Sequence, residues 1–197
     1  MRILLIHERY QYAGGEDIVF EAEKSLLTAH GHEVAVYERN NEEINRYSPL
    51  QKAALLYKTA WAPDSYRDFT TRLEEYRPQI AHFHNTFPLI SPAAYYACAR
   101  AGIPVVQTLH NYRLICPVAT LYRDGHVCTD CVGRLPWPGI LHACYRDSRA
   151  QTAAVAAMAT IHRGLRTWSR KVDTYIAVSD FARAMFIRGG LPADKVV

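Results

Sequence analysis

The sequence has no apolar segment long enough to cross a lipid bilayer. Its apolar runs are short, as at Ile3 to Ile6, whereas a transmembrane helix needs about 20 predominantly apolar residues. His7, Glu8 and Arg9 follow that run at once, so it is also too short for the apolar region of a secretory signal peptide. We therefore expect a cytoplasmic protein.

A strong excess of charge of either sign is also missing. Lys and Arg number 23 against 19 Asp and Glu, which gives a formal net charge of +4. So small an excess is not the basic footprint of a nucleic-acid-binding protein, and we expect no nucleic-acid partner. A phosphate-bearing ligand or an anionic lipid surface remains compatible with it.

The sequence does contain a regular alternation of short apolar strands and amphipathic helices. Its 197 residues, 49% of them hydrophobic, are enough for one sizeable core. Strands are expected at 2–6, 33–37, 80–83, 104–109 and 174–178, with helices between them, two of which flank Pro63. This order predicts an α/β fold, a Rossmann-like doubly wound parallel sheet with helices on both faces.

We interpret residues 1–197 as a single domain of a longer protein. After a turn at Gly189, Gly190 and Pro192, the residues Lys195 to Val197 have the composition of a new strand that is not completed. A further domain is therefore expected to follow.

Polar side chains follow four of the expected strands. Ligands of an open parallel sheet bind beyond the carboxyl ends of its strands, so these residues are the candidates for a binding cleft. They are His7, Glu8, Arg9, Gly14, Gly15 and Glu16 after the first strand, His84 and Asn85 after the third, His110, Asn111, Tyr112 and Arg113 after the fourth, and Ser179 and Asp180 after the fifth. The pattern predicts one cleft rich in His, Asn, Arg and Gly.

Three histidines in this set have competing interpretations. His110 ends a strand and could donate a hydrogen bond to a sugar hydroxyl or carry a proton, with a structural role as the alternative. His82 and His84 flank Phe83 and so share one face of a strand. A buried structural pair is the alternative for both, and it fits His82 better than His84, which lies nearer the strand end.

Gly14 and Gly15 lie just before a helix. Paired glycines let the backbone approach a ligand closely and present amide groups to phosphate or hydroxyl oxygens, although a tight turn would also explain them. Their spacing is not the GxGxxG fingerprint, and no Walker lysine follows. NAD-binding and P-loop functions therefore lose support.

In their order along the chain, these motifs resemble the N-terminal domain of the retaining group 1 glycosyltransferases, the GT4 family. The resemblance covers nearly all 197 residues and rests on the Gly14-Gly15-Glu16 loop, His82-Phe-His84-Asn85, Thr108-Leu-His110-Asn111-Tyr112-Arg113 and Ala177-Val178-Ser179. It implies the N-terminal half of a GT-B fold. The first domain would then bind the acceptor and a second domain, absent here, most of the nucleotide-sugar donor, with no catalytic metal.

The resemblance also implies roles for individual residues. Gly14 and Gly15 would approach the donor phosphates, and His110 would be catalytic, beside the transferred sugar. Further donor- or acceptor-binding candidates are Glu16, His84, Asn85, Asn111, Tyr112, Arg113 and Ser179. The donor-binding Glu motif of the family belongs to the second domain, so this chain alone should lack efficient transfer. The acceptor would be a glycan, a lipid-linked glycan or a small molecule, as in polysaccharide biosynthesis.

Four of the five cysteines fall within residues 110–147. They are Cys116, Cys128, Cys131 and Cys144, a central CxxC with eleven and twelve residues on either side. A CxxC can supply two of the four thiolates of a structural zinc site, and a segment this rich in Pro and Gly would benefit from such a clamp. Reduced core cysteines are the main alternative, and a thioredoxin-type pair fits less well. Cys98, on a short Ala-rich helix, is expected in the core.

The segment 110–147 is longer than an ordinary loop and should overhang the acceptor cleft. Tyr122 and Trp137 within it could stack on a sugar face or pack on the domain. The end of the long helix is basic, with Arg163, Arg166, Arg170 and Lys171. These side chains could face solvent or could contact anionic lipid at the inner face of the membrane. The alternative function is a noncatalytic, zinc-stabilised α/β binding module that recognises a partner through the cysteine segment.

Overall fold

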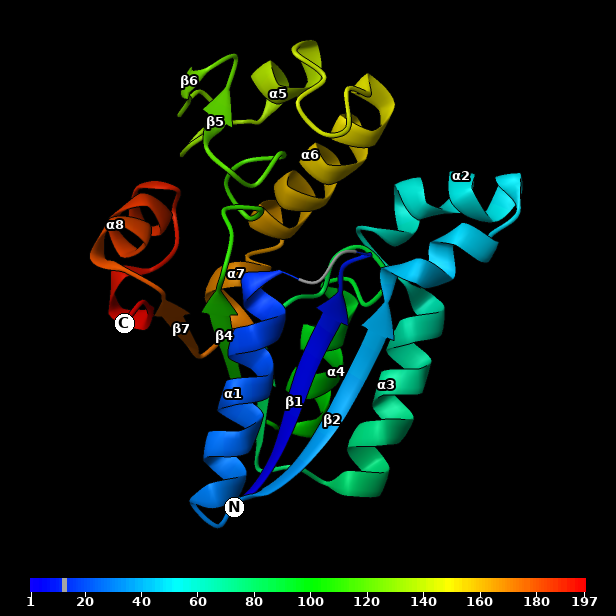
Figure 1. Ribbon diagram of the computed structural model, residues 1–197, viewed down its shortest axis with the longest axis vertical. Coiled ribbons are helices and arrows are strands. Elements are labelled where there is room, and N and C mark those ends of the chain that lie inside the picture. The colour runs from blue at the N-terminus through cyan, green and yellow to red at the C-terminus, as the bar shows by residue number, and fades with distance from the viewer. Residues whose placement is uncertain (12–13) are drawn as a thin grey trace.

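The computed structural model describes residues 1–11 and 14–197 and is built on one parallel sheet (Figure 1). The strands of this sheet are β1 (Arg2–Arg9), β2 (Glu33–Asn40), β3 (Ile80–Phe83), β4 (Val105–Leu109) and β7 (Thr174–Ala177). Their order is β2-β1-β3-β4-β7, and every neighbouring pair is parallel. The five expected strands and their parallel arrangement are therefore confirmed.

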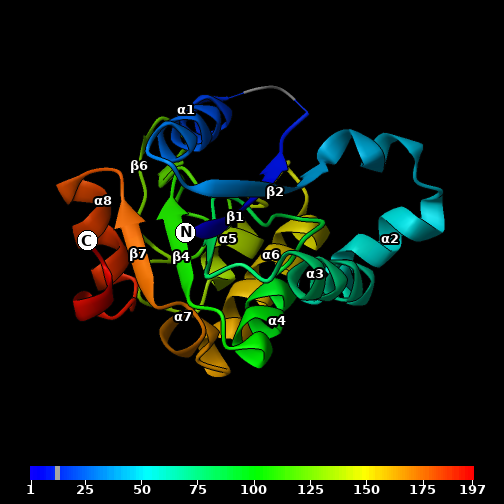
Figure 2. The same cartoon turned by 90° about the horizontal axis from the view of Figure 1, so that it is seen from below.

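Helices lie on both faces of the sheet, as the doubly wound prediction requires. One face is covered by α1 (Gly15–Ala29), and the other by α3 (Pro63–Tyr76) and α4 (Ala93–Ala101) (Figure 2). The other helical elements described are η1 (Asn41–Arg46), α2 (Pro49–Lys58), α5 (Trp137–Leu141), α6 (Arg149–Gly164), α7 (Thr167–Arg170), α8 (Asp180–Arg188) and η2 (Ala193–Lys195).

The helix boundaries follow local sequence signals. A proline near the first helical position opens both α2 and α3, where its missing N–H costs nothing. Ser48 caps α2 by accepting a hydrogen bond from the Gln51 N–H at 3.3 Å. Gly102 ends α4 at a φ of 69°, a conformation that glycine adopts without steric cost. Two helices on either side of Pro63 are thus found as predicted.

Alternate residues of β1 pack into two separate apolar layers. Ile3 and Leu5 contact Phe20 of α1 on one face, whereas Leu4 and Ile6 belong to the larger cluster on the opposite face. Each such side chain contributes about 1.5–3 kcal/mol on full burial. The larger cluster also contains Cys98, fully buried on α4 as expected.

The first two strands run three residues beyond their predicted ends. Their pairing continues from Arg2 opposite Glu33 to Arg9 opposite Asn40. His7 and Glu8 are therefore strand residues that face opposite sides of the sheet, not loop residues. The apolar pattern stops at Ile6, but the backbone hydrogen bonds of a sheet do not depend on apolar side chains, so the pattern alone placed the boundary too early.

The segment 110–147 lies over the carboxyl ends of the strands (Figure 1). It folds into a short hairpin of β5 (Tyr122–Arg123) and β6 (His126–Val127), followed by α5. At the other edge of the sheet, Val196 forms a parallel bridge with Tyr175 of β7, where the sequence indicated a new strand. Within the described ranges, no helix combines the length and the apolar character needed to cross a membrane.

Candidate active site

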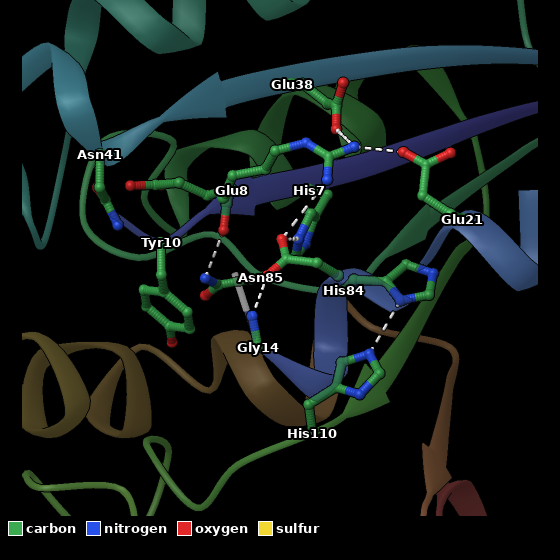
Figure 3. A network of polar contacts seen from close by, with 12 residues as sticks. His7, Glu8, Tyr10, Gly14, Glu21, Glu38, Asn41, His84, Asn85 and His110 are labelled. Carbon is green, nitrogen blue, oxygen red and sulfur yellow. Dashed lines mark hydrogen bonds and ion pairs between the residues drawn. The ribbon is translucent and has the colours of Figure 1, made fainter. Parts of the chain in front are cut away.

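The carboxyl ends of β1, β3 and β4 place their polar residues on one rim above the sheet (Figure 3). His84 Nδ1 and His110 Nε2 are 2.9 Å apart. Asn85 donates through Nδ2 to the carbonyl oxygen of Glu8 at 2.8 Å. These contacts connect the carboxyl ends of three neighbouring strands.

Four histidine rings and one phenylalanine pack together beneath α1. His7 stacks on Phe20 with ring centroids 4.8 Å apart, and Phe20 meets His84 edge-on at 5.1 Å. His84 lies 4.7 Å from His82 and stacks on His110 at 5.1 Å. Only His110 in this column is half-buried instead of buried, so it forms the outer end that reaches the rim.

Glu23 of α1 contacts the inner end of the column. Its Oε1 lies 2.6 Å from His82 Nδ1, and its Oε2 lies 3.5 Å from His84 Nε2. His84 Nε2 makes no hydrogen bond, but the nearby carboxylate favours a proton on it, and in that tautomer Nδ1 of His84 accepts from Nε2–H of His110. This assignment leaves His110 Nδ1 with a free lone pair.

Burial keeps His7, His84 and His110 neutral by lowering the pKa of each ring. It lowers the pKa of His84 to about 2, with nearby histidines lowering it further. It likewise lowers the pKa of His110 to about 4. The pKa of His7 is also below its usual value because burial outweighs its hydrogen bond to Asp17. At neutral pH, His110 is therefore an uncharged hydrogen-bonding ring.

The same carboxylate and rings are also a candidate metal-ligand set. Within the described residues, Glu23, His82 and His84 are the one group that places three ligand atoms within 4.8 Å of one another. Two imidazoles and a carboxylate are a common set for divalent transition metals. Here Glu23 already lies 2.6 Å from His82 Nδ1, and the second nitrogen of His84 faces His110, so these groups have partners within the protein.

The glycine loop enters the site at the N-terminus of α1. The Gly14 N–H donates to Asp17 Oδ2 at 2.7 Å, and Asp17 Oδ1 lies 2.9 Å from His7 Nε2, which fixes the loop to β1. A Cβ atom placed on Gly14 or Gly15 would meet no protein atom within 4 Å, and Gly14 has an ordinary φ of −123°. Neither packing nor backbone conformation therefore requires glycine at these positions.

Glu16 links the glycine loop to the segment that follows β4. It lies close to Tyr10 and Asn111, whose polar groups lower its pKa, but burial has the larger effect and raises the pKa of its carboxyl group to about 7. The Asn111 amide also donates to the Tyr10 hydroxyl at 3.4 Å. Arg113, nearby, holds its guanidinium 4.2 Å from the centre of the Phe87 ring. The predicted residues of these two loops thus lie together.

Glu8 is fully buried, which its position among polar residues did not suggest. Its carboxyl oxygens accept hydrogen bonds from the backbone N–H groups of Leu89 at 2.9 Å and Ile90 at 3.0 Å. Burial raises its pKa to about 8, against the lowering effect of those hydrogen bonds. The carboxyl group holds in place the chain between β3 and α4. Its alternation with His7 along β1 was the signal that could have placed it under the sheet.

A cavity of about 460 Å³ opens beside the rim. Its walls come from η1, α2, α6 and the loops after β1 and β3, and its lining includes the aromatic residues Tyr10, Phe87 and Tyr145 and the charged residues Lys52 and Arg146. Tyr10 belongs both to this wall and to the hydrogen bonds around Glu16. The volume is within the range of small-molecule binding sites. Its lining comes from distant parts of the chain, so the sequence did not reveal it.

Comparison with known proteins identifies the family. Residues 14–197 match Glycosyltransferase Family 4. The chain belongs to this family. No curated protein matches its sequence.

Solved structures match this family 4 chain in fold at low sequence identity. UDP-N-acetylglucosamine 2-epimerase from Rickettsia bellii superposes with a TM-score of 0.52 at 13% identity, and MnaA of S. aureus, in a co-structure with UDP, with 0.50 at 11%. Anabaena Alr3699/HepE in complex with UDP has 16% identity and a TM-score of 0.47. Each match covers 100% of this chain but only 43%, 42% and 43%, respectively, of the other. The chain thus spans less than half of their length and has the Rossmann-like N-terminal half of the GT-B fold.

Several predicted site residues of this family 4 domain make contacts within the protein. Asn85 also accepts from the Phe87 N–H at 3.1 Å, and Tyr112 stacks on Phe186 of α8 at 5.4 Å. Ser179 caps α8 by accepting from the Ala182 N–H at 3.2 Å. His84 is buried and adjoins the rim through His110. The residues best placed to touch a ligand directly are those of the glycine loop and the segment from His110 to Arg113.

Proposed function

We propose that this domain binds the acceptor and forms one wall of the catalytic cleft of a retaining glycosyltransferase that uses a nucleotide-sugar donor. The observation that carries the proposal is the position of His110. It is a neutral ring held against His84, on the rim that also bears the open glycine loop and lies beside the 460 Å³ cavity. A second domain supplies most of the donor site, so the isolated domain should transfer poorly.

The donor phosphates are placed against the N-terminus of α1. Amide groups and the positive end of the dipole at a helix N-terminus favour anionic ligands. The empty space around Gly14 and Gly15 supports this placement, because the protein itself gives no steric or conformational reason for glycine there. Glu16 and Asn111, joined across the loop, would meet hydroxyl groups of the transferred sugar.

His110 acts in this proposal by hydrogen bonding to the transferred sugar. Its Nδ1 lone pair accepts from a sugar hydroxyl, while its Nε2–H is held by His84. The orientation is set before the sugar binds, which reduces the entropic cost of reaching the reactive geometry. His84 is therefore a positioning residue for the ring proposed as catalytic.

The acceptor is placed in the 460 Å³ cavity, where aromatic faces can pack against sugar rings. One wall is α2, which has no buried residue. Its Leu50 is 84% and Tyr57 61% exposed. This supports a lipid-linked acceptor and a peripheral contact with the inner face of the membrane through α2. Of the basic residues expected to make that contact, Arg163 instead donates to the carbonyl of Gly189 at 3.1 Å.

The test is nucleotide release by the full-length protein against a panel of nucleotide sugars, with and without His110→Ala. We expect turnover with one class of donor and a fall in kcat of roughly 10²-fold or more in the variant, with the same thermal unfolding. His126→Ala, an exposed histidine on β6, is the matched control and should leave turnover unchanged. Equal turnover in the wild type and His110→Ala would remove the catalytic role. No turnover and no nucleotide binding would favour the noncatalytic binding module.

A further inference from the structure

Four cysteines of the segment 110–147 line one small cavity. Cys116, Cys128, Cys131 and Cys144 share it with Arg123 and a few apolar residues. Its volume is about 10 Å³, space for a single water-sized or ion-sized occupant. No disulfide joins any of the four, and none of the lining residues borders the proposed acceptor cavity.

The central pair lies in a tight turn directly after the β5–β6 hairpin. The Cys128 N–H donates to the carbonyl of Leu121 at 2.8 Å, which ties the turn to the first strand of the hairpin. The Val132 N–H closes the turn onto the carbonyl of Thr129 at 3.0 Å, and Gly133 follows with a φ of 72°. A hairpin followed by a two-thiol turn offers two ligands from one rigid unit.

The outer pair is brought to the same cavity from both ends of the segment. The Cys116 N–H donates to the carbonyl of Tyr112 at 2.8 Å, in the turn after the rim residues. The Cys144 N–H donates to the carbonyl of Gly139 at 3.0 Å, at the end of α5. Backbone hydrogen bonds thus fix all of the turns from which the thiols project.

Polar groups lie close to the sulfur atoms. The backbone of Gly139 approaches Cys131 so closely that a Cβ on this glycine would lie 3.6 Å from the sulfur. The Arg123 guanidinium lies near Cys144 and Cys128. Burial raises the pKa of Cys131 and Cys144, and the Arg123 cation acts on Cys144 in the opposite direction and favours the thiolate, which is the metal-binding form of cysteine.

The segment has little else to hold it together. Its strands have two residues each and α5 has five, lengths that are not stable without tertiary support. Leu135 is 62% exposed and Trp137 is 60% exposed, so the apolar side chains of this segment are incompletely buried. A bound metal would provide the missing cross-link.

We infer that Cys116, Cys128, Cys131 and Cys144 together bind one Zn²⁺ ion. No three of their sulfurs lie within 4.8 Å of one another in the described chain, so binding draws them inward to Zn–S distances of about 2.3 Å. Four thiols release four protons in this step, and no oxidation state changes. Because the segment begins at His110, the ion also anchors the chain that carries Asn111 and Arg113 on the rim.

The experiment is a zinc count on the full-length protein, purified without chelator, by inductively coupled plasma mass spectrometry. We expect one zinc per chain in the wild type and in Cys98→Ala, the control that removes the remaining cysteine. The double substitution Cys128→Ser with Cys131→Ser should lose it. Should that variant fail to fold, Co²⁺-substituted wild type provides the second measurement, with the absorption bands of tetrahedral cobalt thiolate and four sulfur neighbours in X-ray absorption.

A folded wild-type protein without zinc, whose cysteines all react as free thiols or carry a disulfide by mass, would overturn the inference. So would zinc that survives the double substitution. The count does not depend on sugar transfer. An active transferase without zinc would refute the metal site alone, and a zinc-loaded protein without transfer would refute only the proposed function.

Discussion

At the scale of single residues, the site depends on contacts between histidine rings and on burial. Glu23 lies 3.5 Å from His84 Nε2, and His84 Nδ1 lies 2.9 Å from His110 Nε2. The ring proposed as catalytic is thus held by a second histidine that itself lies near a carboxylate. A residue that never touches substrate should therefore influence the chemical step.

Replacement of His84 tests this chain of hydrogen bonds. His84→Leu removes the acceptor for His110 Nε2–H, so we expect kcat to fall about tenfold with little change in KM. His84→Asn places an amide oxygen near the position of Nδ1 and should recover most of the loss. Steady-state kinetics of the full-length protein would show this. If both variants lose thermal stability alike and keep kcat, the role of His84 is structural.

Glu8 predicts a dependence of stability on pH. Burial raises its pKa from 4.5 to about 8 in the folded state. Below pH 4.5 both states hold the proton; between pH 4.5 and 8 only the folded state does, so stability falls as pH rises through this window. At about 1.4 kcal/mol per pKa unit, the full cost is on the order of 5 kcal/mol.

The substitution Glu8→Gln removes this titration. We expect it to raise the free energy of unfolding relative to wild type more at pH 8.5 than at pH 5, as measured by urea denaturation. Glu74→Gln, on the exposed face of α3, is the control and should track the wild type at both pH values. A constant difference between Glu8→Gln and wild type would show that Glu8 does not titrate in this range.

At the scale of elements, a substitution at the start of α1 should change donor binding without lowering the stability of the fold. Gly15 is the first residue of the helix, and a Cβ there meets no protein atom. Alanine favours helix over glycine by up to about 1 kcal/mol, so Gly15→Ala should leave stability unchanged or higher. The methyl group would occupy the space proposed for the donor phosphates, and we expect the donor KM to rise about tenfold.

Thermal unfolding and nucleotide-release kinetics on the same samples would check this. Gly164→Ala near the end of α6 also meets no protein atom but lies away from the rim, so it should leave the donor KM unaltered. An unaffected donor KM in Gly15→Ala would move the donor phosphates away from this loop.

Elements with a strong local pattern were predictable from the sequence, and long-range contacts were not. The five strands are marked by short apolar runs and the helices around Pro63 by a period of 3.6, so they were found. The pairing of β1 and β2 out to Arg9 and Asn40 is set by the neighbouring strand and by no local signal. The burial of Glu8 likewise depends on backbone N–H groups some eighty residues away.

The candidate site was also predictable only in part. The rim residues follow from their position after strands, a rule of the fold. The proximity of His84 and Glu23 cannot be predicted without knowing which face of α1 meets β3. The cavity proposed for the acceptor cannot be predicted without the relative position of α2 and α6. Ser179 and Tyr112 look similar to the rim residues in sequence, but packing gives them local partners.

At the scale of the whole molecule, Tyr10 lines the cavity proposed for the acceptor and also contacts Asn111 of the rim, while Gly14 and Gly15 are not among the residues that line this cavity. Ala154 of α6 lines the cavity, so Ala154→Phe should fill it and raise the acceptor KM at least tenfold without altering donor affinity. Acceptor titrations at saturating donor, with nucleotide binding measured separately, would show this. Ala157→Phe, exposed on the same helix, is the control. A loss of donor affinity in Ala154→Phe would contradict the separation of the acceptor site from the donor site.

Burial of the residues beneath and beside the rim changes which side chains gain or lose a proton near neutral pH. Histidines normally change charge there, but the pKa values of His84 and His110 lie at about 2 and 4. Carboxyl groups are normally ionised long before, yet Glu16 and Glu8 have pKa values of about 7 and 8. An inflection near pH 7 in a rate profile of the proposed transferase would therefore report a glutamate such as Glu16, and His110 would keep the same charge across the physiological range.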